Sequence, residues 1–264
     1  MEMLMKDLGR YTVLAFAFAF SLMVVAQANA FELGARAYLW IPDLKKADIQ
    51  TIAAGVEQSN INTKDVLGVG NKITYAVEVY GGVGKNHVSL MYTPFGYSSD
   101  AILAAALSYN GVTYNPGTAV RSDLEYSMFD LKYQRDLLNM ENILAGFSVG
   151  AIAQLKYSTG SFKLNASGTG FDQKRSFDSW MPMAGVGAHI GLIANLLEIR
   201  AQATAGGSGS GNYSYEALAD LSVTPFPFLD IHAGYKLLQI KMDKNDYKMD
   251  TLYTGPYVAL TVGF

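Results

Sequence analysis

The strongest constraint on the fold is a period of two in the apolar residues along most of the chain. In residues 251–264, Leu260 and Val262 fall on one parity, while small, polar or tyrosine residues fall on the other. Residues 143–157 and 197–206 alternate in the same way. Because successive side chains of a β-strand point to opposite faces, each run predicts a strand with one apolar face.

Runs of this kind follow one another through the chain after residue 30. We count ten, at about residues 31–41, 73–83, 87–97, 122–135, 143–157, 177–191, 196–206, 213–225, 229–241 and 251–264. Most are longer than the usual strand of about 5–6 residues, and they match the ~9–11 tilted residues that cross a bilayer. Short connections alternate with longer or more polar ones, which lie at 42–72, 98–121, 158–176, 207–212 and 242–250.

Strands in lipid must pair all their backbone N–H and C=O groups, so a membrane sheet has to close on itself. The sequence therefore predicts an all-β fold, a closed antiparallel transmembrane barrel of about ten strands. Short turns would face the periplasm and longer loops the outside. An alternative is eight membrane strands with one weaker pair forming a hairpin outside the bilayer. A soluble sandwich of two sheets would also alternate, but it explains neither the strand lengths nor the alternating connections.

The N-terminal segment has the features of an export signal. Lys6 and Arg10 precede an apolar run at 11–25, and Ala28 and Ala30 form a small-x-small cleavage pattern. A membrane anchor would need about 20 apolar residues. We therefore expect a cleaved signal peptide at residues 1–30 and a single barrel domain at residues 31–264.

The composition excludes several classes of protein. Cysteine is absent, which excludes a disulfide framework and cysteine-based metal sites. Lys and Arg total 20 against 23 Asp and Glu, and this acidic balance argues against a nucleic-acid partner. Charged residues make up 16% of the chain, below the roughly 25% of a typical soluble domain. We expect no cofactor and no bound metal.

Taken together, the signal segment, the alternation and the ending GPYVALTVGF resemble the small outer-membrane β-barrel proteins of Gram-negative bacteria, the broad group of OmpA-like and OmpW-like barrels. The resemblance implies an outer-membrane location and partnership with outer-membrane lipid. It also implies that Phe264, with Val262 and Leu260 in register, is a signal read by the barrel-assembly machinery. Because the group includes pores, adhesins, enzymes and structural barrels, the resemblance leaves the function open.

The parity of the strands predicts which charged side chains point into the lumen. Our candidates for lining it are Arg36, Glu78, Asp130, Lys132, Glu198, Arg200, Asp220, Asp230, His232 and Lys236. The same parity adds Glu32, His87, Lys156 and Glu216.

These candidates suggest a narrow porin-like passage for small hydrophilic solutes or ions. The alternative is a non-conducting structural or surface-binding barrel, in which the opposed charges pair and plug the lumen. Such a barrel would act through its loops at 42–72 and 98–121. A carrier of apolar compounds is less favoured, because the expected lumen is charged. The oligomeric state is not predicted.

Enzymatic activity is not expected. The chain has three histidines, His87, His189 and His232, which fall near the periplasmic ends of strands that are not neighbours. A general base has to lie within hydrogen-bond reach of its partner, and the sequence places no serine or aspartate beside a histidine at the outer rim.

Overall fold

A computed structural model describes residues 31–140, 146–166, 172–193, 196–209, 211–244 and 246–263. It contains a barrel of ten antiparallel strands, closed by pairing of the first with the last. The strands are β1 (Phe31–Trp40), β5 (Thr74–Val83), β6 (Asn86–Ile102), β9 (Ala119–Met140), β10 (Phe147–Ala166), β11 (Asp172–Ile193), β12 (Leu197–Ser208), β13 (Asn212–Phe226), β14 (Leu229–Lys244) and β15 (Tyr247–Gly263).

The predicted fold class is thus confirmed, with ten barrel strands and not eight. The expected signal peptide at residues 1–30 and the assembly-signal residue Phe264 lie outside the described residues. Among the described residues, no helix is long and apolar enough to cross a membrane.

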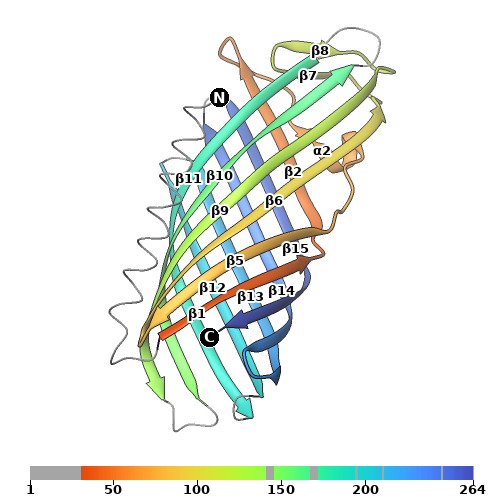
Figure 1. Cartoon of the computed structure of the whole chain (residues 1–264). Coiled ribbons are helices and arrows are strands. Elements are labelled where there is room, and N and C mark those ends of the chain that lie inside the picture. Colours follow the sequence, from red (N-terminus) through yellow and green to blue (C-terminus); the bar gives the residue numbers. More distant parts are fainter. Residues whose placement is uncertain are drawn as a thin grey trace, which may run out of the picture.

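Smaller elements gather at one end of the barrel (Figure 1). After Ile41 and Pro42 the chain continues from β1 into β2 (Asp43–Ala53), which pairs with the upper half of β15. The short strands β3 (Val56–Glu57) and β4 (Ile61–Asn62) pair with β2, and helix α2 (Thr63–Leu67) follows. A separate hairpin is formed by β7 (Leu107–Tyr109) and β8 (Val112–Tyr114). In the plan of outer-membrane barrels this end is extracellular, and the end with the short turns and the C-terminus is periplasmic.

Four neighbouring strands reach further outward than the sequence predicted. β6, β9, β10 and β11 contain 17, 22, 20 and 22 residues. β10 and β11 occupy most of the segment 158–176, which we expected to be a connection, whereas β6 and β9 enter only the two ends of the segment 98–121. The connection predicted at 242–250 is likewise mostly strand, and the one at 207–212 is half strand.

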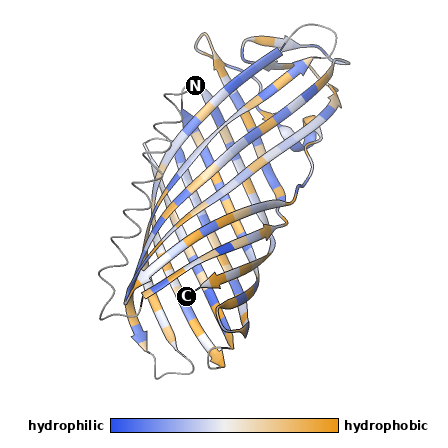
Figure 2. Ribbon diagram, in the orientation of Figure 1, coloured by the Kyte–Doolittle hydropathy of each residue, from blue (hydrophilic) through white to orange (hydrophobic). Residues whose placement is uncertain are grey.

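The reason for this difference is that the apolar residues of each long strand lie on its outer face in the lower half and on its inner face in the upper half. In the periplasmic half of β10, Leu155 points outward and is 37% exposed, whereas Phe162 and Leu164 in the outer half are fully buried in the interior. The outer face of a strand contacts lipid within the bilayer and water above it, so the apolar residues move from the outer face to the inner one. Figure 2 shows the alternation of hydrophobic and hydrophilic residues along the strands.

A row of aromatic side chains marks the level of this change on the outer surface. Tyr92, Phe129, Tyr157 and Trp180 are direct cross-strand partners on β6, β9, β10 and β11. Their ring centroids are 5.0, 6.4 and 4.2 Å apart in that order. Aromatic girdles of this kind lie at the interfaces of membrane barrels. We call these four residues the aromatic row.

Candidate functional site

The periplasmic half of the lumen contains a polar cavity of about 420 Å³, which we call the periplasmic cup. Seven of the ten residues that the sequence predicted to line the lumen surround it: Arg36, Glu78, Lys132, Glu198, Arg200, Asp230 and His232. The other three, Asp130, Asp220 and Lys236, are buried. The structure thus places these ten charged side chains on the inner face of the barrel wall, which is the face that the parity of the strands predicted.

A buried ion cluster lies deeper in the lumen than the cup. The ammonium of Lys156 has no exposed surface and lies 2.5 Å from Asp130 Oδ1 and 2.9 Å from Glu216 Oε2. Lys236 lies 3.0 Å from the other carboxylate oxygen of Glu216. Because an unpaired charge is costly to bury, this mutual pairing lets the strands carry charges inside a narrow barrel.

Further pairs form between neighbouring strands at the boundary of the cup. Arg36 on β1 lies directly opposite Glu78 on β5, with 3.1 Å between the charged atoms. Arg200 on β12 lies opposite Asp220 on β13, at 2.7 Å. The phenol of Tyr257 also donates a hydrogen bond to Asp220. Most of the predicted lumen charges therefore neutralise one another.

Lys132 differs from the other lumen cations. Its ammonium donates a hydrogen bond of 2.8 Å to Gln202 Oε1. No ion pair joins it to a carboxylate within the described part of the chain. It faces the cup beside Arg36 and Arg200, so the cup contains one cation whose charge no neighbouring carboxylate neutralises directly.

All three histidines line the cup, although they belong to strands that are not adjacent. His87 contacts Glu32 at 2.7 Å, His189 contacts Glu198 at 2.9 Å, and His232 contacts Asp220 at 3.1 Å. The sequence did not foresee that they share one cavity, because the stagger of the strands decides which ends meet. No group of three metal-ligating side chains occurs among the described residues.

The lumen above the ion clusters is filled by aromatic side chains. Trp40, Phe95, Tyr97, Tyr126 and Tyr253 are each 4% exposed or less. The rings of Phe95 and Tyr126 stack with centroids 4.6 Å apart, and the hydroxyl of Tyr126 donates to that of Tyr253 at 2.7 Å. We call these five residues the aromatic seal. Sequence reasoning placed the tyrosines of residues 251–264, Tyr253 among them, on the face opposite the apolar one, but it did not name the other four as lining the lumen.

The β7–β8 hairpin closes the barrel above the aromatic seal. The buried hydroxyls of Tyr109 and Tyr114 donate to the backbone carbonyls of Phe162 and Leu164 on β10, at 3.1 and 3.3 Å. The Asn110 backbone N–H donates to Thr51 on β2 at 2.9 Å.

β2 and β10 lie on opposite sides of the barrel in the strand order, so the hairpin bridges two walls. Its turn residues Asn110 and Gly111 have positive φ angles of 48° and 82°, as this residue pair predicts for a tight hairpin.

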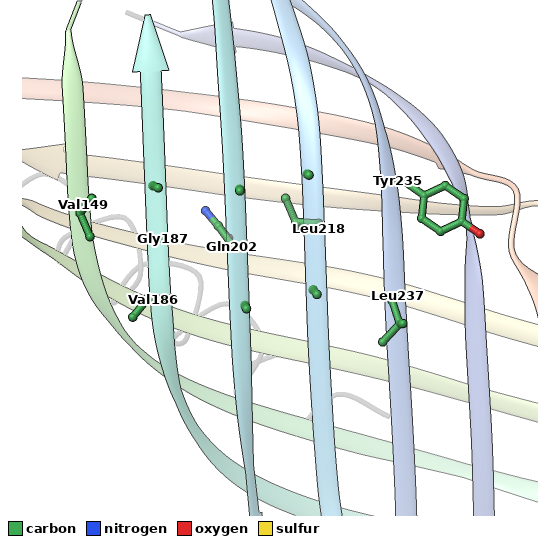
Figure 3. Close-up of a pocket in the computed structure, with 12 residues that line it drawn as sticks. Val149, Val186, Gly187, Gln202, Leu218, Tyr235 and Leu237 are labelled. Atoms are coloured by element: carbon green, nitrogen blue, oxygen red, sulfur yellow. The ribbon is translucent and has the colours of Figure 1, made fainter. Parts of the chain in front are cut away.

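A shallow hollow of about 490 Å³ lies on the lipid-facing surface of β10–β14 (Figure 3). Val149 and Val186 border it on one side, and Tyr235 and Leu237 on the other. The outward residues between them are all alanines: Ala188, Ala201, Ala203, Ala217 and Ala219. These methyl groups offer lipid chains a recess but no reactive or ionisable group.

Comparison with known proteins identifies similar folds but no sequence family. No protein-family model matches the chain, and no curated protein sequence does. The outer-membrane protease OmpT of Escherichia coli superposes with a TM-score of 0.54 at 13% identity, covering 90% of this chain and 99% of that one. The translocator domain of the autotransporter NalP of Neisseria meningitidis gives 0.42 at 10% identity, covering 97% of each chain. OprG of Pseudomonas aeruginosa gives 0.34 at 13% identity, covering 89% of this chain and 94% of that one.

The closed barrel, its apolar belt and the likeness to OmpT define the class: this protein is an outer-membrane β-barrel of the small Gram-negative type. Its location is accordingly the bacterial outer membrane. At 13% identity the likeness to a protease shows the fold alone.

Proposed function

We propose that this protein is a sealed outer-membrane barrel that does not conduct hydrophilic solutes and that acts through its extracellular part. The observation that carries the proposal is the filled outer half of the lumen. There the aromatic seal, the fully buried Leu164 and Ile240, and the tyrosines of the β7–β8 hairpin pack into one buried cluster between the walls. A hydrated ion would have to shed its water in a layer of mostly aromatic and aliphatic side chains, whose few hydroxyls cannot replace the hydration shell, and this is strongly unfavourable.

The extracellular part consists of short elements and loops that are held on the rim of the barrel. β2, β4 and α2 connect back to the barrel through residues 68–73, and the hydrogen bonds of the β7–β8 hairpin fix it against β2 and β10. Loops on a rigid scaffold are common binding sites. The proposal assigns no catalytic role to the histidines, because each contacts a carboxylate in the periplasmic cup, far from the outer rim.

A porin-like passage is the second candidate, and the periplasmic cup favours it. Arg36, Lys132 and Arg200 line the cup and would attract small anions. Conduction through such a passage would require the hairpin and the aromatic seal to move together.

Electrical recording separates the two candidates. Protein purified from outer membranes is inserted into a planar lipid bilayer, and the current is recorded over a range of voltages. The sealed barrel predicts no current steps in the unmodified protein. Regular steps with a preference for anions, shifted toward cations by Arg200→Glu, would support the porin-like passage and refute the sealed barrel.

A further inference from the structure

We propose that the outer wall formed by β6, β9, β10 and β11 binds the phosphorylated sugar headgroup of a glycolipid in the outer leaflet. This site lies on the outside of the barrel and does not depend on whether the lumen conducts.

The wall is hollowed directly above the aromatic row. Pro94, Ser127 and Thr159 are direct cross-strand partners one step above that row, and Gly96, Glu125 and Ser161 are partners one step higher. Except for Glu125 these side chains are small, and they leave a groove of about 600 Å³, flanked on one side by Lys72, Ile73 and Tyr75. We call it the wall groove.

The groups that line the wall groove suit a sugar. Thr159 and Ser161 supply hydroxyls, and Ser127 supplies a third that lies 3.2 Å from the hydroxyl of Tyr92. Glu125 supplies a carboxylate that forms no ion pair within the described residues. Tyr75 is 61% exposed and offers a ring at the edge of the groove. An amphipathic aromatic ring beside hydroxyls and a carboxylate can contact both the C–H and the O–H groups of a sugar.

The height of the wall groove points to a lipid headgroup and not to a dissolved sugar. The aromatic row below it marks the membrane interface. The apolar belt continues below that row through Leu90 and Leu131, which are 48% and 49% exposed. A glycolipid seated with its sugar in the groove therefore places its acyl chains against this belt.

A pair of lysines lies beyond the wall groove. Lys163 on β10 is the direct cross-strand partner of Lys174 on β11. Like charges directly opposite each other destabilise a sheet, and neither lysine forms an ion pair in the part of the chain that the structure describes. On the other side of Lys163 is Asp123, whose carboxylate lies 3.5 Å from Arg121.

A phosphate between the two ammonium groups would relieve their repulsion. Lys163 follows Ser161 by two residues, which is about 7 Å along a strand. That spacing is comparable to one sugar unit, so a sugar in the wall groove and its phosphate at the lysine pair can belong to one headgroup.

Two variants test the two halves of this site separately. Gly96→Leu fills the wall groove: a Cβ there meets no described atom within 4 Å except Lys72 Nζ at 3.9 Å, so the backbone is not strained. Lys163→Gln/Lys174→Gln removes both charges. Lys241→Gln on β14, in the opposite wall, is the matched control. Each protein is purified in neutral detergent micelles, and its folding is checked by the heat-dependent shift of its mobility on gels.

Binding is then measured by titration with a phosphorylated disaccharide lipid, with phosphatidylglycerol and with inorganic phosphate. The unmodified protein should bind the disaccharide lipid at least about tenfold more tightly than phosphatidylglycerol, and inorganic phosphate more weakly still. Both site variants should lose about tenfold in affinity for the disaccharide lipid, and Lys241→Gln should not.

Equal affinity for the two lipids would reduce the site to a general attraction for anions and overturn the proposal. Unchanged binding in Gly96→Leu would exclude the wall groove, and the absence of binding would exclude the site. If Gly96→Leu does not fold, Thr159→Leu fills the same groove from β10.

Discussion

Lys156 shows how a single charged residue is tolerated inside this barrel. Its ammonium is fully buried between Asp130 and Glu216. Lys156→Met should lower the free energy of unfolding by about 3–5 kcal/mol, because two buried carboxylates lose their shared cation. Urea unfolding in detergent micelles measures this change. Lys45→Met, which removes an exposed ion pair with Asp43, is the control and should leave the unfolding midpoint unchanged. A midpoint equally unaffected in Lys156→Met would show that the cluster contributes no stability.

The opposite faces of the wall should differ in their tolerance of a new charge. Val258 points to lipid and is 50% exposed, whereas Ser148 lines the periplasmic cup. Val258→Arg should cost roughly 2–4 kcal/mol of stability, because lipid cannot solvate the guanidinium. Ser148→Arg should stay within about 0.5 kcal/mol, because the new side chain enters a polar cavity and not lipid. Unfolding of both variants in phosphatidylcholine vesicles measures the difference. Equal costs would mean that the register is displaced by one residue.

Among the elements, β1, β5, β12 and β13 were predicted from sequence over nearly their whole length, whereas the upper ends of β6, β10, β11 and β15 were not. In β15, Val258 and Leu260 keep one apolar parity through the bilayer, which predicts both the strand and its face. Above the bilayer the buried residues Met249 and Tyr253 take the other parity. A sequence search for strands with one constant apolar parity therefore finds each strand only up to the level where its outer face passes from lipid into water. This change also explains why the predicted loops at 158–176 and 242–250 are mostly strand.

The tight turn of the β7–β8 hairpin was predictable from the sequence, but the position of the hairpin across the top of the barrel was not. Asn110 and Gly111 specify the turn, whereas the contacts of Tyr109 and Tyr114 depend on β10, which is distant in the sequence. Tyr109→Ala/Tyr114→Ala should release the hairpin, so that protease added to intact cells cleaves between residues 103 and 118. The barrel itself should stay folded, because its ten strands pair without the hairpin. Resistance to protease equal to that of the unmodified protein would show that other contacts fix the hairpin.

For the whole molecule, sequence reasoning identified the charged interior but not its division into two parts. The inward charges follow from alternation alone. The contact between Lys156 and Glu216 joins strands that are not neighbours, so it depends on the stagger and bore of the closed barrel. The aromatic seal was missed because only charged side chains were taken as candidates for the lumen, although Phe95 shares the inward parity of His87 and Tyr126 that of Asp130.

The central claim is that the lumen consists of a water-filled periplasmic cup below a dry seal. The chain contains no cysteine, so single cysteines can report access to a membrane-impermeant thiol reagent from either side of the outer membrane. Ser148→Cys and Gln202→Cys line the cup and should react from the periplasmic side alone. Met128→Cys and Thr251→Cys, at positions that are fully buried, should react from neither side. Reaction of Met128→Cys or Thr251→Cys in the folded barrel would show that water reaches the seal and would contradict the account.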